Sequence, residues 1–170
     1  MNGNTEVNSG PPKGNGTAEL GDPPEGAEVI IEPPQADPYS SWEMHIDGAK
    51  NSQGAGVGVV LKSPKGAVFE QCLQFNFPVT NNEAEYEALL AGLRSTNKLG
   101  VPELCIYSDS KLVVNQVTGK FEAREIKMAK YLKKTKSLIS KFKTIKIEQV
   151  GRELNAHADS LAALASVFES

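Results

Sequence analysis

Apolar residues alternate with polar or small ones in three short stretches of the chain, at residues 42–47, 55–61 and 68–75. A period of two is typical of β-strands that expose one face. Residues 51–54 and 63–66 lie between the stretches and are rich in Asn, Ser, Pro and Gly, which favour tight turns. The pattern therefore predicts three strands joined as an antiparallel meander.

A helical period follows, in which Tyr86, Leu89, Leu90 and Leu93 share one face. Residues 80–82 are Thr and Asn, which are good helix caps, and Gly100 and Pro102 end the pattern. The rest of the chain predicts a strand, two helices, a strand and a helix, at residues 104–107, 110–117, 123–142, 145–150 and 155–168. The order βββαβααβα describes an α/β fold, and the crossover before the fourth strand predicts parallel pairing.

Composition divides the chain into two parts. Residues 1–40 hold seven of the ten prolines and few aromatic residues, so we expect a disordered acidic tail or linker there. The domain is expected to span residues 41–170. Residues 1–43 carry a net charge of −7, which leaves +4 on the remainder of a chain whose total is −3. The acidic chain thus contains a basic domain.

Cysteine usage and hydropathy limit the setting in which the protein works. Cys72 and Cys105 lie in strand-like stretches without metal-ligand spacing, so we expect both to be reduced core residues. No apolar run approaches membrane-spanning length, and the acidic N-terminus resembles neither a secretory signal nor a transit peptide. We expect an intracellular protein, cytoplasmic or nuclear, without a membrane partner.

Four acidic residues stand where strands or helices can bring them to one point: Asp47, Glu85, Asp109 and Asp159. Asp47 and Asp109 each close an apolar run, and parallel neighbouring strands would place both at one sheet edge. Glu85 and Asp159 lie within Ala- and Leu-rich helical patterns, where a charge is costly without a partner or a metal. Because Mg²⁺ prefers carboxylates and phosphate oxygens, this set predicts phosphodiester chemistry.

Four motifs together resemble the ribonuclease H family: Asp47-Gly48, TNNEAE at 80–85, SDS at 108–110, and Asp159 followed by Leu161-Ala162. Each motif alone is weak, but their order and separations fit the family over nearly all of residues 42–168. The stretches NSQGAGVGVVL, TNNEAEYEALLAGL, SDSKLVVNQV and NAHADSLAALAS are most similar to the ribonuclease H region of plant gypsy-class retrotransposon polyproteins and domesticated relatives.

The resemblance implies a fold and an activity. The fold is a five-stranded mixed sheet flanked by helices, with strands 1–3 antiparallel and strands 4 and 5 parallel to strand 1. The activity is hydrolysis of the RNA strand of an RNA/DNA hybrid. It implies that two Mg²⁺ ions, with Mn²⁺ as a substitute, are held by the catalytic set Asp47, Glu85, Asp109 and Asp159. A reverse transcriptase domain in a parent polyprotein is an expected partner.

The resemblance also implies which residues contact the hybrid. Thr80 would face the DNA phosphate, while Asn81 and Asn82 would reach bases and 2′-hydroxyls, which distinguish RNA from DNA. Residues 120–146 add ten Lys or Arg against two Glu. Such a run is usually a solvated face, but its single sign favours phosphate contact, and we expect it from Lys130, Lys133 and Lys134.

The chain departs from the family at a loop before the last Asp, where many members carry a catalytic His. Residues 151–154 are Gly-Arg-Glu-Leu, without one. His157 is two residues from Asp159, and such positions do not share a helix face, so a surface or capping role is the better interpretation. His45 shares strand parity with Asp47, but we favour a satisfied core histidine. The family's longer cellular members also insert a basic helix and loop that grips the hybrid, and here Gly119 leads almost directly into the next predicted helix instead.

Each key residue also has a purely structural interpretation. Asp47 and Asp109 suit turn or helix caps, Glu85 an ion pair, and Asp159 an exposed helix edge. Gly54, Gly56 and Gly58 alternate on one strand, which indicates a bulge, tight packing, or close approach of a nucleic-acid backbone.

The leading hypothesis is a metal-dependent endonuclease of retroelement type. A catalytically weak nucleic-acid-binding scaffold with the same fold is the alternative. An integrase-like or resolvase-like nuclease is a third hypothesis, which the TNNxxE and SDS motifs disfavour.

Overall fold

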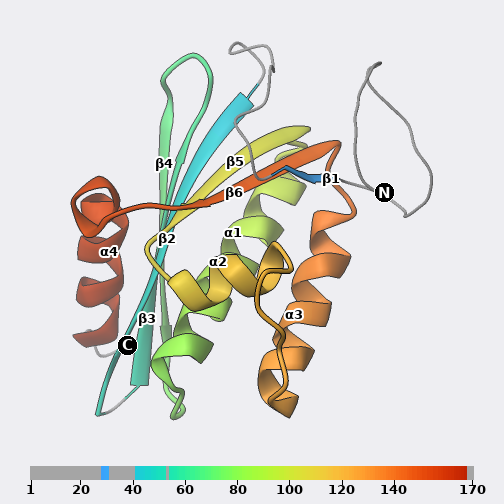
Figure 1. Cartoon of the computed structure of the whole chain (residues 1–170). Helices are drawn as coiled ribbons and strands as arrows, with labels where there is room; N and C mark the ends of the chain where they lie inside the picture. The colour runs from blue at the N-terminus through green and yellow to red at the C-terminus, as the bar shows by residue number, and fades with distance from the viewer. Residues whose placement is uncertain (1–27, 31–40, 53, 168–170) are drawn as a thin grey trace.

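A mixed β-sheet forms the centre of the protein in a computed structural model, which describes residues 28–30, 41–52 and 54–167 (Figure 1). The described residues form one six-stranded sheet of order β1-β6-β5-β2-β3-β4. Its strands are β1 (Glu28–Ile30), β2 (Ser41–Asn51), β3 (Gly54–Lys62), β4 (Val68–Phe75), β5 (Glu103–Ser108) and β6 (Thr144–Gln149).

The strand directions confirm the predicted fold. β2, β3 and β4 form the antiparallel meander, and β5 and β6 run parallel to β2. One strand was not predicted: β1 pairs in parallel with β6, within the segment that we expected to be a tail. Three residues are too few to show a period of two. The other residues of 1–40 lie outside the described part of the chain.

Helices cover both faces of the sheet: α1 (Asn81–Lys98), α2 (Lys111–Val117), α3 (Ile126–Ile139) and α4 (Ala156–Val167), with the short 3₁₀ helix η1 (Arg152–Asn155). In Figure 1, α1, α2 and α3 lie on one side of the sheet and α4 on the other. The main core lies between the sheet and the helices α1, α2 and α3. It includes the fully buried Met44, Ile46, Tyr86, Leu89, Leu104, Ile106 and Ile147. No helix of the described residues is long and apolar enough to span a bilayer.

Local sequence explains where the elements before the site begin and end. Gly66 adopts a φ of +94° in the β3–β4 turn, a conformation that L side chains rarely take. Thr80 caps α1: its hydroxyl accepts from the Glu83 amide at 3.1 Å, and the Glu83 carboxylate accepts from the Thr80 amide at 2.9 Å. This reciprocal capping box fixes the first turn of the helix that carries Glu85.

The alternating glycines of β3 allow α4 to pack directly on the sheet. A Cβ added to Gly56 or Gly58 would lie 2.2–2.3 Å from carbonyl oxygens of α4, those of Ala162 and Ala158. A Cβ on Gly54 would likewise lie 2.2 Å from the Phe75 carbonyl oxygen. Tight packing, rather than approach of a nucleic-acid backbone, therefore accounts for these glycines.

Several boundaries differ from the prediction. β2 continues past Asp47 to Asn51, because its pairing with β3 extends further than its pairing with β5. α3 spans Ile126–Ile139, shorter than predicted at both ends, and η1 precedes the last helix. Cys72 is exposed, because β4 is an edge strand, so its assignment to the core was wrong. Cys105 is partly buried, and both thiols are free.

Candidate metal and active site

The strand register brings Asp47 and Asp109 together. Ile46 pairs with Ser108 at the last step of the parallel β2–β5 ladder, so the next residues are Asp47, further along β2, and Asp109, directly after β5. Carboxyl ends of parallel strands are the usual ligand-binding edge of an α/β sheet. The side chain of Asp47 is buried, with 4% of the residue exposed, whereas Asp109 is partly exposed in the turn before α2.

Helix α1 delivers Glu85 to the same point because Gly48 leaves room for it. A Cβ on Gly48 would lie 2.3 Å from the Ala84 carbonyl oxygen, so only glycine permits this approach. The Gly48 amide then donates to Glu85 Oε1 at 3.0 Å. This hydrogen bond holds the Glu85 carboxylate beside the strand that carries Asp47.

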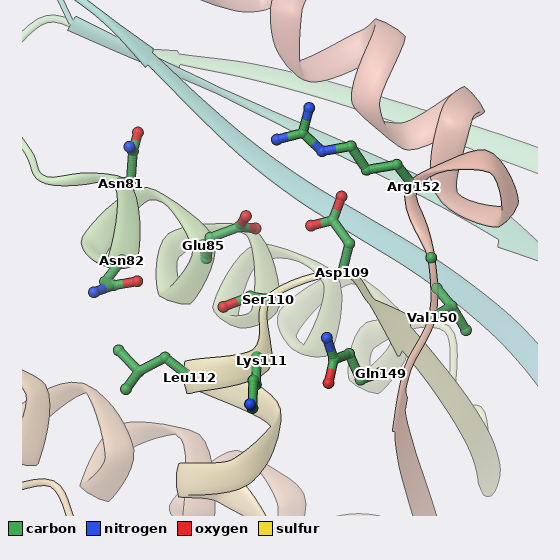
Figure 2. A pocket seen from close by; sticks show the side chains of 11 residues that line it. Asn81, Asn82, Glu85, Asp109, Ser110, Lys111, Leu112, Gln149, Val150 and Arg152 are labelled. Carbon is green, nitrogen blue, oxygen red and sulfur yellow. The ribbon is translucent and has the colours of Figure 1, made fainter.

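Three of the four predicted carboxylates form one cluster. Asp47, Glu85 and Asp109 each offer an oxygen atom, and these atoms lie within 4.8 Å of one another. Beside them is a pocket of about 450 Å³, between the start of α1, the β5–α2 turn and the end of β6. Figure 2 shows Glu85 and Asp109 facing this pocket, with Asn81 and Asn82 at one side and Arg152 at the other.

The cluster is electrostatically crowded. Burial raises the pKa of Asp47 to about 9, and the negative charges of Glu85 and Asp109 add to the effect. Burial also raises the pKa of Glu85 to about 8, although the hydrogen bond from Gly48 opposes the shift. Like charges and low polarity both disfavour ionised carboxylates, so the cluster favours a proton or a cation.

Asp159 lies at the edge of this cluster rather than inside it. It is exposed in the first turn of α4 and is not among the three carboxylates within 4.8 Å. It nevertheless contributes a hydrogen bond and a negative charge that raise the pKa of Asp47. Asp159 thus approaches Asp47 from α4, on the opposite face of the sheet to α1.

Neither histidine lies among the carboxylates. His157 is exposed and pairs with Glu70 of β4 across 2.5 Å, as expected for a surface residue. His45 is partly buried; its ring stacks on Tyr107 with centroids 4.9 Å apart, and burial lowers its pKa. The loop before α4 instead supplies Arg152, which extends over the pocket above Asp109 in Figure 2 and lowers the pKa of Glu85.

The predicted hybrid contacts divide into two groups. Asn81 and Asn82 are exposed and line the pocket, whereas Thr80 is exposed beside them and uses its hydroxyl as the α1 cap. The predicted lysines of α3 do not reach the pocket. They form an exposed stripe of Lys130, Lys133 and Lys134 on a helix that packs against α1.

Two contacts fix α3 relative to the start of α1. Tyr131 donates to Glu87 Oε2 at 2.7 Å, and Lys127 lies 3.5 Å from Glu83 Oε2. Glu83 is also the capping-box residue of α1. These contacts link the helix of the basic stripe to the helix whose start lines the pocket.

The sequence did not assign a site role to Gly48, Arg152 or Asn155. Gly48 was noted only as the second residue of a motif, since nothing in the sequence shows which helix it contacts. Asn155 is 1% exposed and donates from Nδ2 to the Ile46 carbonyl oxygen at 2.8 Å. The sequence shows a cation at Arg152 and an Asn directly before the last helix. It does not show that their neighbours in space are residues of distant segments, such as Ile46 for Asn155.

The donor set fits a hard divalent cation. All the clustered ligand atoms are carboxylate oxygens, which Mg²⁺ and Mn²⁺ prefer, and the pocket leaves space for a phosphate beside them. The pKa of Asp47 and the pKa of Glu85 are both raised, as expected for clustered carboxylates whose surroundings do not neutralise their negative charge. A mixed sheet of this topology, with acidic residues where its two central parallel strands stop pairing, defines the ribonuclease H-like class of folds.

Comparison with known proteins gives the family. The family model described as reverse transcriptase-like matches residues 45–165. Ribonuclease HI of Halobacterium salinarum is 30% identical over 144 residues, which cover 84% of this chain and 71% of that protein. The chain therefore belongs to the reverse transcriptase-like family of ribonuclease H domains.

Solved structures agree in fold. The crystal structure of ribonuclease H1 from H. salinarum matches with a TM-score of 0.70 at 31% identity, covering 74% of this chain and 96% of that one. LC11-RNase H1 in complex with an RNA/DNA hybrid matches with a TM-score of 0.67 at 28% identity, covering 73% of this chain and 95% of that one.

A further relative is much longer. The bifunctional protein Rv2228c of Mycobacterium tuberculosis is 38% identical over 117 residues, which are 68% of this chain and 32% of that protein. The present chain thus spans about a third of the length of this relative.

Proposed function

We propose that the protein is a Mg²⁺-dependent endonuclease that cuts the RNA strand of RNA/DNA hybrids. The observation that carries the proposal is the cluster of Asp47, Glu85 and Asp109 oxygens within 4.8 Å, beside an open pocket. Its family membership and its likeness to ribonuclease H structures support the same reaction class. Asp159 is proposed as the fourth carboxylate, reaching the cluster from α4.

The residues would divide the work between holding cations and placing the phosphate. Asp47 and Glu85 would hold the ions on the buried side, while Asp109 and Asp159 would do so on the solvent side. When bound, a pair of divalent ions would supply a nucleophilic water and charge stabilisation for in-line phosphodiester hydrolysis. Gly48 keeps Glu85 oriented by its amide hydrogen bond, so the carboxylate needs little rearrangement before it binds a cation.

Selectivity for a hybrid would come from the start of α1. Asn81 and Asn82 are exposed on the pocket rim and carry amides that both donate and accept, as 2′-hydroxyls and base edges require. A relative of the same fold is known in complex with an RNA/DNA hybrid, which supports the same substrate here. The α3 lysine stripe would add phosphate contacts beyond the pocket.

Arg152 is proposed to contact the phosphate that enters the pocket. Its side chain extends over the pocket from the loop in which many family members carry a His (Figure 2). A guanidinium remains charged at any working pH, so it would bind phosphate without taking part in proton transfer. We also propose a retroelement origin and a reverse transcriptase domain as partner, which the description of the matching family supports.

A cleavage assay on three substrates tests the function. The protein is incubated with an end-labelled RNA/DNA hybrid, duplex RNA and duplex DNA of one sequence, in Mg²⁺, in Mn²⁺ and in EDTA. We expect cleavage of the RNA strand of the hybrid alone, with 3′-hydroxyl ends, and none in EDTA. An Asp109→Asn variant should not cleave. Failure of the wild type to cut the hybrid across both metal titrations would favour the scaffold alternative.

A further inference from the structure

Asn155 connects the loop before α4 to the strand that carries Asp47. It is the last residue of η1, it is 1% exposed, and it lies four positions before Asp159. Its Nδ2 donates at 2.8 Å to the carbonyl oxygen of Ile46. That carbonyl belongs to the peptide that joins Ile46 to Asp47, so the hydrogen bond acts directly on the backbone of a carboxylate residue.

His45 orients the Asn155 amide. His45 Nδ1 lies 3.3 Å from Asn155 Oδ1. Because an amide oxygen only accepts, Nδ1 must carry the imidazole proton for this bond to form. The ring is itself held by its stacking on Tyr107, with centroids 4.9 Å apart. With Oδ1 held by His45, the amide can direct only Nδ2 at Ile46.

We propose that His45 and Asn155 are positioning residues that fix Asp159 and Arg152 relative to Asp47. Neither residue belongs to the carboxylate cluster or lines the main pocket. They act through η1, which begins at Arg152 and leads into α4, the helix of Asp159. This inference rests on the proposed function, since it assumes that these two side chains act together with Asp47.

Asp47 lies on strand β2, whereas Asp159 lies on helix α4, which covers the face of the sheet opposite to α1. α4 packs directly on β3 at Gly56 and Gly58, and the hydrogen bonds of Asn155 link the start of α4 to β2. Outer hydrogen bonds of this kind typically change metal affinity or activity by roughly 10- to 100-fold when they are removed.

Asn155→Ala removes both hydrogen bonds. We expect kcat for hybrid cleavage and Mn²⁺ affinity each to fall by roughly 10-fold or more, with KM close to that of the wild type. His45→Phe keeps an aromatic ring on Tyr107 but removes the donor, and it should cause a smaller loss in the same quantities. His45→Asn places an amide donor near the position of Nδ1. Its kcat and Mn²⁺ affinity should therefore lie closer to the wild type than those of His45→Phe.

A matched control separates positioning from general destabilisation. Asn115 donates from Nδ2 to the Lys111 carbonyl oxygen at 2.7 Å, but it is not among the residues of the main pocket. Asn115→Ala should leave kcat and Mn²⁺ affinity unchanged. The double variant of His45→Phe and Asn155→Ala should be no worse than Asn155→Ala alone, because both changes break one connection.

The experiment measures Mn²⁺ affinity by calorimetric titration, kcat and KM for a hybrid, and melting temperature, for the full chain and each variant. A folded Asn155→Ala protein with kcat and Mn²⁺ affinity equal to the wild type would overturn the proposal, as would a raised KM at unchanged kcat. If Asn155→Ala does not fold, the His45 variants decide instead. Equal kcat and Mn²⁺ affinity in His45→Phe and the wild type would then overturn the proposal, whereas a loss in His45→Phe that His45→Asn restores would support it. If the wild type cuts no hybrid, the proposed function fails, and Mn²⁺ affinity alone still decides the positioning role.

Discussion

Removing the charge of Glu85 should stabilise the metal-free protein. In the folded state the pKa of Glu85 is raised from 4.5 to about 8, first by burial, with the charges of Asp109 and Asp159 adding to it. A raised carboxyl pKa means that the folded protein binds more protons than the unfolded chain between these two values. Stability therefore falls as pH rises from about 4.5 to about 8. Glu85→Gln has no such penalty and keeps an oxygen that can accept from Gly48.

The size of the effect follows from the same two values. Each pH unit above 4.5 costs about 1.4 kcal/mol until the folded-state pKa is reached. The penalty thus reaches at most about 3 kcal/mol at pH 7 and stays below about 1 kcal/mol at pH 5. At roughly 3–5 °C per kcal/mol for a domain of this size, Glu85→Gln should raise the melting temperature by up to about 15 °C at pH 7 in EDTA.

Thermal melts at pH 5 and pH 7, each in EDTA and in Mg²⁺, test this reasoning. Mg²⁺ should stabilise the wild type more than the variant, because an ion that binds only the native state stabilises it by mass action. Glu87→Gln is the matched control: it lies on the same helix, accepts from Tyr131, and should not raise the melting temperature. A Glu85→Gln protein that melts at or below the wild-type temperature in EDTA at pH 7 would refute the crowded-carboxylate account.

Three further predictions concern binding and packing. Changing the α3 stripe to Gln, at Lys130, Lys133 and Lys134 together, should weaken hybrid binding and reduce the slope of log K against log [salt] by up to about 3, measured by fluorescence anisotropy; an unchanged slope would mean a merely solvated face. Gly58→Ala should lower the free energy of unfolding by about 1–3 kcal/mol in urea titrations, because the new Cβ would meet the Ala158 carbonyl oxygen at 2.3 Å. An unchanged free energy of unfolding would mean that α4 packs differently on β3. Arg152→Gln should lower kcat/KM for the hybrid roughly 10-fold, with Arg152→Lys less affected, whereas equal activities would remove Arg152 from the site.

Much of the fold follows from local pattern. The meander and the cap at Thr80 depend on residues close together in the sequence, and the parallel pairing follows from the handedness rule for crossovers; the structure confirms all three. β1 was missed because three edge residues carry no usable period. The full length of β2 was missed because its extra pairing is with β3 and not with β5.

The candidate site was predictable to the extent that register decides it. Asp47 and Asp109 meet because they follow paired residues of parallel strands, and the sequence places both at strand ends. Glu85 reaches them only because Gly48 admits the α1 backbone, a contact between segments far apart in sequence. Asn155 and Arg152 could not be assigned for the same reason.

Metal location in a hybrid complex tests the central claim most directly. Crystals of the wild-type protein with a non-hydrolysable RNA/DNA hybrid would be soaked in Mn²⁺ and measured by anomalous diffraction. We predict anomalous peaks coordinated by Asp47, Glu85 and Asp109, with Asp159 adjoining them and an RNA-strand phosphate between the ions. Mn²⁺ bound only elsewhere, or a hybrid whose RNA strand lies away from this cluster, would contradict the account.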